Sequence, residues 1–152
     1  MIGNLTNEQI KEVLEDNVWG HLGCNDGLNT YVYPLNYLYD GSRYITCHSQ
    51  EGFKVQVMRK NNRVCFQVDE MKNHTNWKSV MVLGEYQEVN DEQECYHAMK
   101  AFADRRLFLK KSESALLLRI NEQGTNMQVK NESRPVIYRI LIDEKKGRYE
   151  NG

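Results

Sequence analysis

Hydrophobic and polar residues alternate along most of this chain, as they do in β-strands with one buried face. Strands are predicted at residues 19–24, 30–39, 63–68, 77–89 and 136–143, with a further strand that begins at Tyr44. Turn-forming residues such as Asn25-Asp26-Gly27 join several of them closely. Six or seven strands connected in this way, with a few helices, most easily close into a small antiparallel barrel with the helices outside.

Helical spacing of apolar residues appears in three places. The first helix is predicted from about residue 7 to 16, where Thr6 and Gln9 form a capping box. A short helix is predicted at 53–60. A third helix follows a cap at Asn90 or Asp91, and its buried stripe is expected to consist of Cys95, Met99, Phe102 and Leu107.

Pro34 constrains the strand at 30–39. Proline cannot donate a hydrogen bond to a neighbouring strand, so this strand is either at a sheet edge or opened at that point. An opened ladder beside Asn36 would leave backbone groups available to a planar polar ligand, and both interpretations remain open. Apolar residues on both faces of the strand predict cover on both sides, and hence a homodimer in which a second copy covers part of the outer wall.

Two stretches are less clear. The apolar run at 115–120, within residues 110–133, fits a strand or a helix, since short apolar runs do not distinguish the two. Gly84 predicts a bulge or a barrel corner within the long strand at 77–89. The residues after 143 read as a polar tail.

The overall composition is that of one domain spanning residues 1–152. Twenty basic and twenty-one acidic side chains leave a net charge of −1, which gives no reason to expect binding to nucleic acid or to an anionic membrane. No apolar run approaches the roughly 20 residues that span a bilayer, and no secretory signal is visible. The four scattered cysteines argue against a zinc site or disulfides, so a cytoplasmic location is expected.

The most chemically suggestive stretch is 44–54, where a strand runs through a polar turn into a short helix. Its turn gathers His48, Ser49, Gly52 and Lys54. Backbone N–H groups and a positive dipole end point outward where a helix begins, so this junction predicts a phosphate site. Serine, glycine and lysine are also ordinary turn residues, and that alternative stays open.

The order of motifs resembles a known family. It runs from Tyr31-Val-Tyr-Pro-Leu-Asn-Tyr37 through Thr46-Cys-His-Ser49, Gly52, Lys54, Asn61 and Val64-Cys-Phe66 to Trp77-Lys-Ser79-Val80 and Gly84. This order is similar to that of the flavin-binding split-barrel proteins related to pyridoxamine 5′-phosphate oxidase, and especially of their 5-nitroimidazole-resistance, nitroreductase-like branch. The resemblance implies a six-stranded antiparallel split barrel, a homodimer with flavin at the subunit interface, and FMN as cofactor, with FAD as the variant.

The resemblance also implies a set of site residues. Leu35, Asn36 and Tyr37 would lie along the isoalloxazine ring, and Lys54, at the turn that holds Gly52, would bind the phosphate. Trp77 and Ser79 would complete the pocket, from the same chain or from the partner subunit. The ring and the ribityl phosphate would be bordered by Thr46, Cys47, His48 and Ser49. Phe53 departs from the family pattern, which often has a second basic residue there, and so predicts a weaker grip on FMN or a preference for FAD.

The function implied is that of a flavin-dependent oxidoreductase that passes electrons from NADH or NADPH to a small acceptor such as a nitroaromatic. His48 is the candidate for proton transfer, with a structural turn histidine as the alternative. His21, His74 and His97 show no metal-ligand spacing. The competing hypothesis is a carrier that holds flavin, haem or a deazaflavin without turnover.

Overall fold

The computed structural model describes residues 1–105 and 135–152. The predicted features at 110–133, and Leu107 in the third helix, lie outside the described residues.

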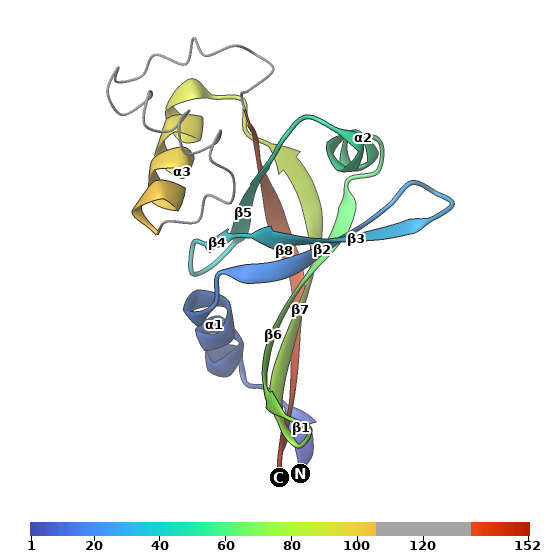
Figure 1. Cartoon of the computed structure of the whole chain (residues 1–152), viewed down its shortest axis with the longest axis vertical. Coiled ribbons are helices and arrows are strands. Elements are labelled where there is room, and N and C mark those ends of the chain that lie inside the picture. The colour runs from blue at the N-terminus through green and yellow to red at the C-terminus, as the bar shows by residue number, and fades with distance from the viewer. Residues whose placement is uncertain (106–134) are drawn as a thin grey trace.

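The strands form one curled antiparallel sheet (Figure 1). Their order is β3-β2-β6-β7-β8-β5-β4, and β1 pairs with β8 beside this path. Because Tyr37 alone separates β3 from β4, the two ends of this order are one continuous stretch of chain. The sheet therefore closes into a ring of six strands, which confirms the predicted split barrel. The bounds are β1 Ile2–Asn4, β2 Trp19–Asn25, β3 Thr30–Asn36, β4 Leu38–Tyr39, β5 Tyr44–Ser49, β6 Arg63–Asn73, β7 Asn76–Glu88 and β8 Val136–Asn151.

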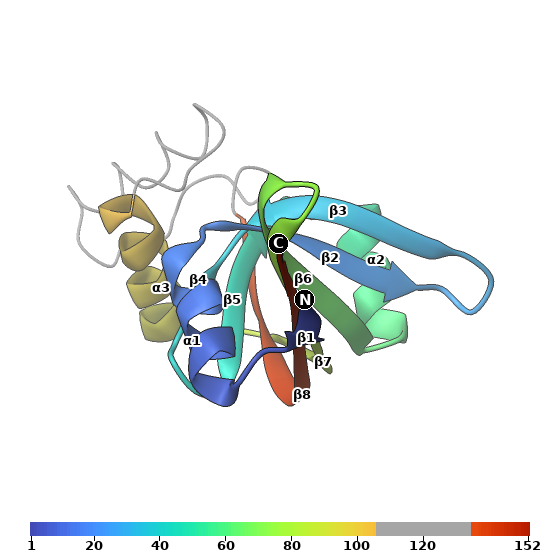
Figure 2. The ribbon, with the colours of Figure 1, turned by 90° about the horizontal axis from the view of Figure 1, so that it is seen from below.

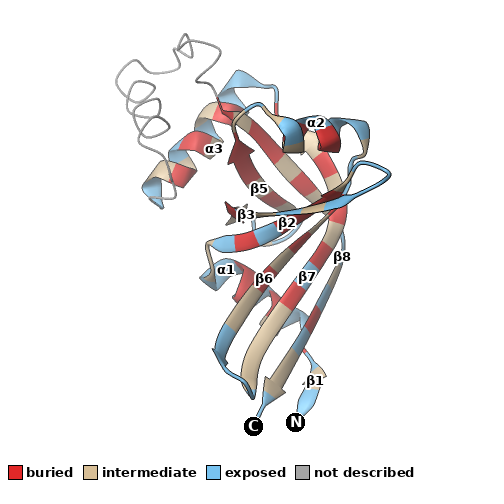
Figure 3. Cartoon of the chain, turned by 45° about the vertical axis from the view of Figure 1, so that its right-hand side comes forward, coloured by how far each residue is buried: buried red, intermediate tan, exposed pale blue. Residues whose placement is uncertain are grey.

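Alternate residues of each strand face the inside of this ring, where the main core lies (Figure 3). Leu22, Phe66 and Val82 are opposite one another across β2, β6 and β7, and each is 0% exposed. The next row along β8 and β5 adds Ile140 and Ile45, which are equally buried. Regular inward alternation thus gives the barrel a continuous apolar interior.

The described residues include three helices that lie against the sheet: α1 (Asn7–Asp16), α2 (Phe53–Lys60) and α3 (Glu92–Asp104). Figure 2 shows α1 and α3 on one side of the ring and α2 on the other. Both predicted caps are confirmed, because Thr6 forms its capping box with Gln9 and Asp91 accepts from the Glu94 amide. The second, smaller core lies under α3 and consists of Val89, Cys95, Met99 and Ile137.

The predicted strand at 30–39 breaks at Tyr37, whose backbone N–H turns to donate to the Val18 carbonyl. Before the break β3 pairs with β2, and after it β4 pairs with β5. Pro34 faces His21 of β2, and no second partner strand is found for β3 in the described chain. The edge-strand interpretation of Pro34 is therefore correct.

Two strands are longer than predicted. β6 continues to Asn73, and β8 continues through the supposed polar tail to Asn151, where it pairs with β7 and β1. The tail is polar because its outward side chains meet solvent, so its composition concealed a strand. The bulge predicted at Gly84 is confirmed by a register shift between Leu83 and Gly84. A Cβ atom at Gly84 would collide with the Leu141 carbonyl oxygen, which explains the glycine.

Candidate functional site

The predicted phosphate site lies where β5 ends and α2 begins. Lys54 Nζ donates to Ser49 Oγ at 3.3 Å, so the strand end and the helix start are joined by these two side chains. Gly52 is the N-cap of α2 and supplies no side-chain cap to the first amides of the helix. Among the described residues, a Cβ at Gly52 would meet only the Gln50 carbonyl oxygen, 3.9 Å away, so these residues leave room beside the backbone here.

Aromatic contacts hold the start of α2 against β3. The Phe53 ring packs edge-on against Tyr31 with centroids 5.0 Å apart. Lys54 Nζ lies 5.2 Å from the centroid of the Tyr33 ring, a cation–π contact. Phe53 stands where the resembling family often has a second basic residue. It adds no charge there, and its contact with Tyr31 holds the start of α2 in place beside Lys54.

A cluster of ion pairs around Arg59, which the sequence did not predict, lies on the other side of the turn. The Arg59 guanidinium pairs with Glu51 in the turn and with Glu88 at the end of β7, each at 2.8 Å. Tyr86 Oη donates to the same Glu88 carboxylate at 2.7 Å. No spacing in the sequence signals this cluster, because its members come from a turn, a helix and a distant strand.

This cluster predicts a pH dependence of stability. The hydrogen bond from Arg59, reinforced by that from Tyr86, holds the pKa of Glu88 below its ordinary value, against the opposing effect of burial. A carboxyl with a lowered folded-state pKa stabilises the fold above its unfolded-state pKa and loses that contribution as the pH falls through the folded value. In urea unfolding, wild type is expected to exceed Glu88→Gln in stability at about pH 7. The difference is expected to shrink as the pH falls below the ordinary glutamate pKa of 4.5 and to vanish only below the lowered folded-state pKa. A difference that stays constant with pH would contradict this.

Residues 46–49 do not line a single pocket, because successive residues of β5 point to opposite faces. Cys47 and Ser49 face the barrel interior, whereas Thr46 and His48 face outward. The His48 ring packs edge-on against Phe102 of α3 with centroids 4.6 Å apart, and His48 is 7% exposed. Burial raises the pKa of the Cys47 thiol, so this residue stays protonated at neutral pH.

The same alternation divides Leu35, Asn36 and Tyr37. Leu35 and Tyr37 belong to the core, and the Tyr37 hydroxyl donates to the Leu14 carbonyl at 2.7 Å. Only Asn36 directs its side chain to the outer face. Its Nδ2 donates to the Val18 carbonyl at 3.1 Å, while its buried Oδ1 accepts no hydrogen bond from the described residues.

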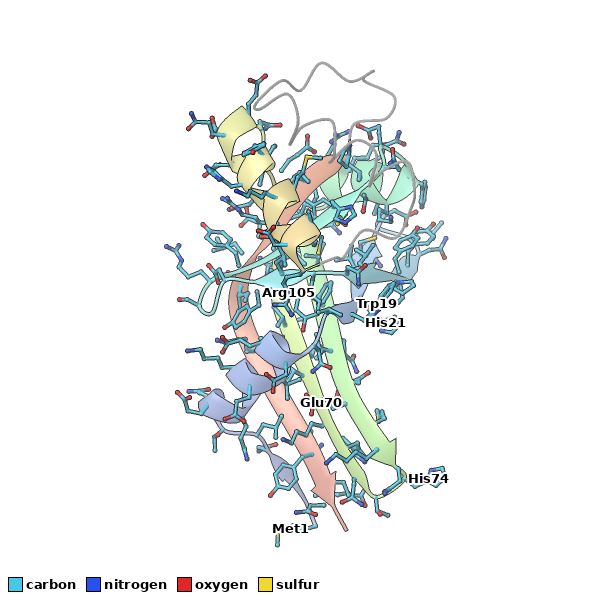
Figure 4. All side chains as sticks on the ribbon, turned by 60° about the vertical axis from the view of Figure 1, so that its left-hand side comes forward. Met1, Trp19, His21, Glu70, His74 and Arg105 are labelled. Carbon is cyan, nitrogen blue, oxygen red and sulfur yellow. The ribbon has the colours of Figure 1, made fainter. Side chains whose placement is uncertain are left out.

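Trp77 and Ser79 lie at the far end of the sheet from the Ser49–Lys54 pair. His48 faces Ile137 on β8, whereas Trp77 faces Glu150, thirteen residues further along the same strand. At about 3.3 Å per residue, these thirteen residues of β8 correspond to roughly 40 Å of strand. Figure 4 labels His74 at the tip of the β6–β7 hairpin, well away from Trp19 on β2. Within one chain these two residues cannot join the site.

Trp77 and Ser79 are on the outer face of the sheet, which carries an apolar patch nearer the ring. Trp19, Val32 and Met81 of this patch are 49%, 63% and 37% exposed. We call this surface the outer wall, and it comprises Trp19, Val32, Pro34, Cys65, Met81 and Leu83. Apolar patches of this kind commonly mark interfaces between proteins.

The described residues contain neither a metal cluster nor a membrane-spanning helix. No group of three or more histidine, cysteine, aspartate or glutamate side chains there could hold a metal ion. None of the described helices is both long enough and apolar enough to span a bilayer.

Comparison with known proteins places this geometry in context. A crystal structure of an FAD-binding protein from Mesorhizobium loti superposes with a TM-score of 0.74 at 28% identity, covering 100% of this chain and 98% of that one. A candidate 5-nitroimidazole antibiotic resistance protein from Bacteroides thetaiotaomicron shares the fold at 18% identity, with a TM-score of 0.70 and coverage of 98% and 87%.

Among curated proteins, an uncharacterized protein from Rhizobium meliloti (strain 1021) is 33% identical over 93 residues, which is 61% of each chain. The family model described as pyridoxamine 5′-phosphate oxidase matches residues 6–148, nearly the whole chain. Together with the six-stranded split barrel, this match shows that the chain belongs to the pyridoxamine 5′-phosphate oxidase family.

Proposed function

We propose that this protein binds a flavin, with the phosphate end of the cofactor at Ser49, Gly52 and Lys54. The observation that carries the proposal is the Lys54 ammonium, held 3.3 Å from the Ser49 hydroxyl at the uncapped start of α2. A cation, a hydroxyl and helix N–H groups at one point suit an anionic oxygen. Family membership and the likeness to an FAD-binding protein support the same conclusion.

The polar groups around the site also fit a flavin. The isoalloxazine ring has an N–H donor on its pyrimidine edge, and the buried Asn36 Oδ1 is an acceptor that finds no donor in the described chain. The hydrogen bond from Asn36 Nδ2 to the Val18 carbonyl fixes the orientation of the amide. We assign Lys54 and Ser49, at the end of β5, to the phosphate, and Asn36 and Thr46, which share the outer face, to the ring.

We further propose a homodimer, with the outer wall as its interface. The exposed apolar residues of the outer wall favour cover by a second copy. Trp77 and Ser79, roughly 40 Å from the phosphate site along β8, contribute to a flavin pocket only if they come from the partner subunit. Light scattering at micromolar concentration is expected to give the mass of a dimer, and a monomer would contradict this part of the proposal.

The bound flavin would supply the redox chemistry, taking electrons from NADH or NADPH and giving them to a small acceptor such as a nitroaromatic. The order of sequence motifs supports this acceptor class. The likeness to the nitroimidazole-resistance structure shows the fold alone and adds no support for the acceptor. For proton transfer we propose His48, whose imidazole is suited to neutral pH. Its packing against Phe102 requires α3 to move for that step. The single lysine at the phosphate site favours a loosely held FMN, or FAD.

Turnover separates this reductase from a flavin carrier. Loaded protein is mixed anaerobically with NADH or NADPH, and the flavin absorption is followed. Bleaching, followed by recovery on adding a nitroaromatic, is expected. A flavin that stays oxidised with both donors would support the carrier and exclude the reductase.

A further inference from the structure

Tyr138 is a buried phenol that points at the candidate site from a distant part of the sequence. In the register of β5 and β8 it faces Cys47, and Ser49 is its diagonal neighbour on the same face. A long aromatic side chain can span that diagonal. The Tyr138 hydroxyl lies 2.9 Å from Ser49 Oγ, in hydrogen-bond contact.

The position of this phenol is fixed by its surroundings. Tyr138 is 0% exposed, and its ring packs against that of Tyr86 with centroids 5.2 Å apart. The Tyr86 hydroxyl is committed to Glu88, so it does not compete for Ser49. Burial raises the pKa of Tyr138 well above its ordinary value, which keeps its hydroxyl proton in place.

The hydrogen bonds around Ser49 determine which way its hydroxyl can point. A serine hydroxyl has one hydrogen to donate and two lone pairs that accept. Lys54 Nζ donates to Ser49 Oγ and occupies one lone pair. If Tyr138 donates to the other, the serine hydrogen is left for a ligand oxygen, and each hydrogen bond in this chain strengthens the next.

We propose that Tyr138 is a positioning residue, which donates to Ser49 and so directs the serine hydroxyl hydrogen to a phosphate oxygen of the bound cofactor. This inference rests on the proposed flavin function. It adds a residue from β8 to a phosphate site otherwise built from the end of β5 and the start of α2. Its expected signature is an effect on binding of the phosphate and not of the ring.

The test compares FMN with riboflavin, which has the same ring but no phosphate. Dissociation constants are measured by fluorescence titration of the full-length apoprotein. Tyr138→Phe is expected to weaken FMN binding about threefold to tenfold, the effect of one hydrogen bond, and to leave riboflavin binding unchanged. Tyr86→Phe is the matched control. It removes a phenol hydroxyl from the same core, but that hydroxyl donates to Glu88 and not to Ser49. The control should leave the ratio of the two constants unchanged.

Two further measurements complete the test. In a Ser49→Ala background, Tyr138→Phe is expected to cause no additional loss of FMN affinity, because the residue acts through Ser49. In wild-type protein labelled at tyrosine Cζ, the Tyr138 resonance is expected to shift with FMN and not with riboflavin, which tests the proposal even if the variant does not fold. Equal losses for FMN and riboflavin, or an unmoved resonance, would overturn the role of Tyr138 alone. Wild-type protein that binds neither flavin would overturn the proposed function and this inference together.

Discussion

Replacing Lys54 with alanine is expected to weaken FMN binding roughly tenfold or more, since a charge-assisted hydrogen bond to phosphate is worth about 1.5–3 kcal/mol. Lys54 lies in the first turn of α2 and contacts Ser49 and the Tyr33 ring, so its ammonium is already held near the proposed phosphate position. Riboflavin affinity should remain unchanged, because riboflavin has no phosphate. The measurement is the pair of dissociation constants for FMN and riboflavin.

Lys60→Ala is the matched control for this change, because it removes a lysine from the exposed end of the same helix. It is expected to leave both constants at their wild-type values. If Lys54→Ala binds FMN as tightly as wild type does, Lys54 is not part of the site and the phosphate must bind elsewhere.

Replacing Met81 with lysine is expected to dissociate the proposed dimer and, with it, to weaken flavin binding sharply. Met81 is 37% exposed on the outer wall and lies opposite Gln67 and Lys146 in the sheet. An unpaired charge buried in an interface costs several kcal/mol, so the dimer dissociation constant should rise by at least about a hundredfold. Sedimentation and flavin titration of the same samples measure the two effects.

Leu28→Lys provides the comparison, because it makes the same chemical change at a hydrophobic residue that is 85% exposed in the β2–β3 turn. Its mass and flavin affinity should match those of wild type. A dimeric Met81→Lys protein would show that the interface lies elsewhere. A monomer that keeps its flavin affinity would show that each chain forms a complete site, without Trp77 and Ser79 of a partner.

Local sequence signals predicted the elements of the fold well. The Thr6 capping box and the Gly84 bulge depend on residues close together in the chain, and both are confirmed. Pro34 left two alternatives open, and the edge strand is the one observed. The second half of β8 was missed because its outward side chains are polar. β1 was missed because three residues are too few to show an alternation.

The site was harder to predict, because it depends on which face each residue occupies. The sequence run from Thr46 to Ser49 suggests one continuous pocket lining, yet a strand sends alternate side chains to opposite faces. Tyr138 was invisible for a different reason. It lies 89 residues from Ser49 in the sequence, and only the pairing of β5 with β8 brings the two hydroxyls together. The sequence at Phe53 indicates only the absence of a second cation. The structure shows that the Phe53 ring packs against Tyr31.

The visible spectrum of the freshly purified protein tests most directly whether this chain holds a flavin. The expected result is a flavin spectrum, with about one FMN or FAD released per chain on denaturation or, if the cofactor is lost in purification, regained on adding either compound. A colourless protein that takes up neither FMN nor FAD would contradict the account.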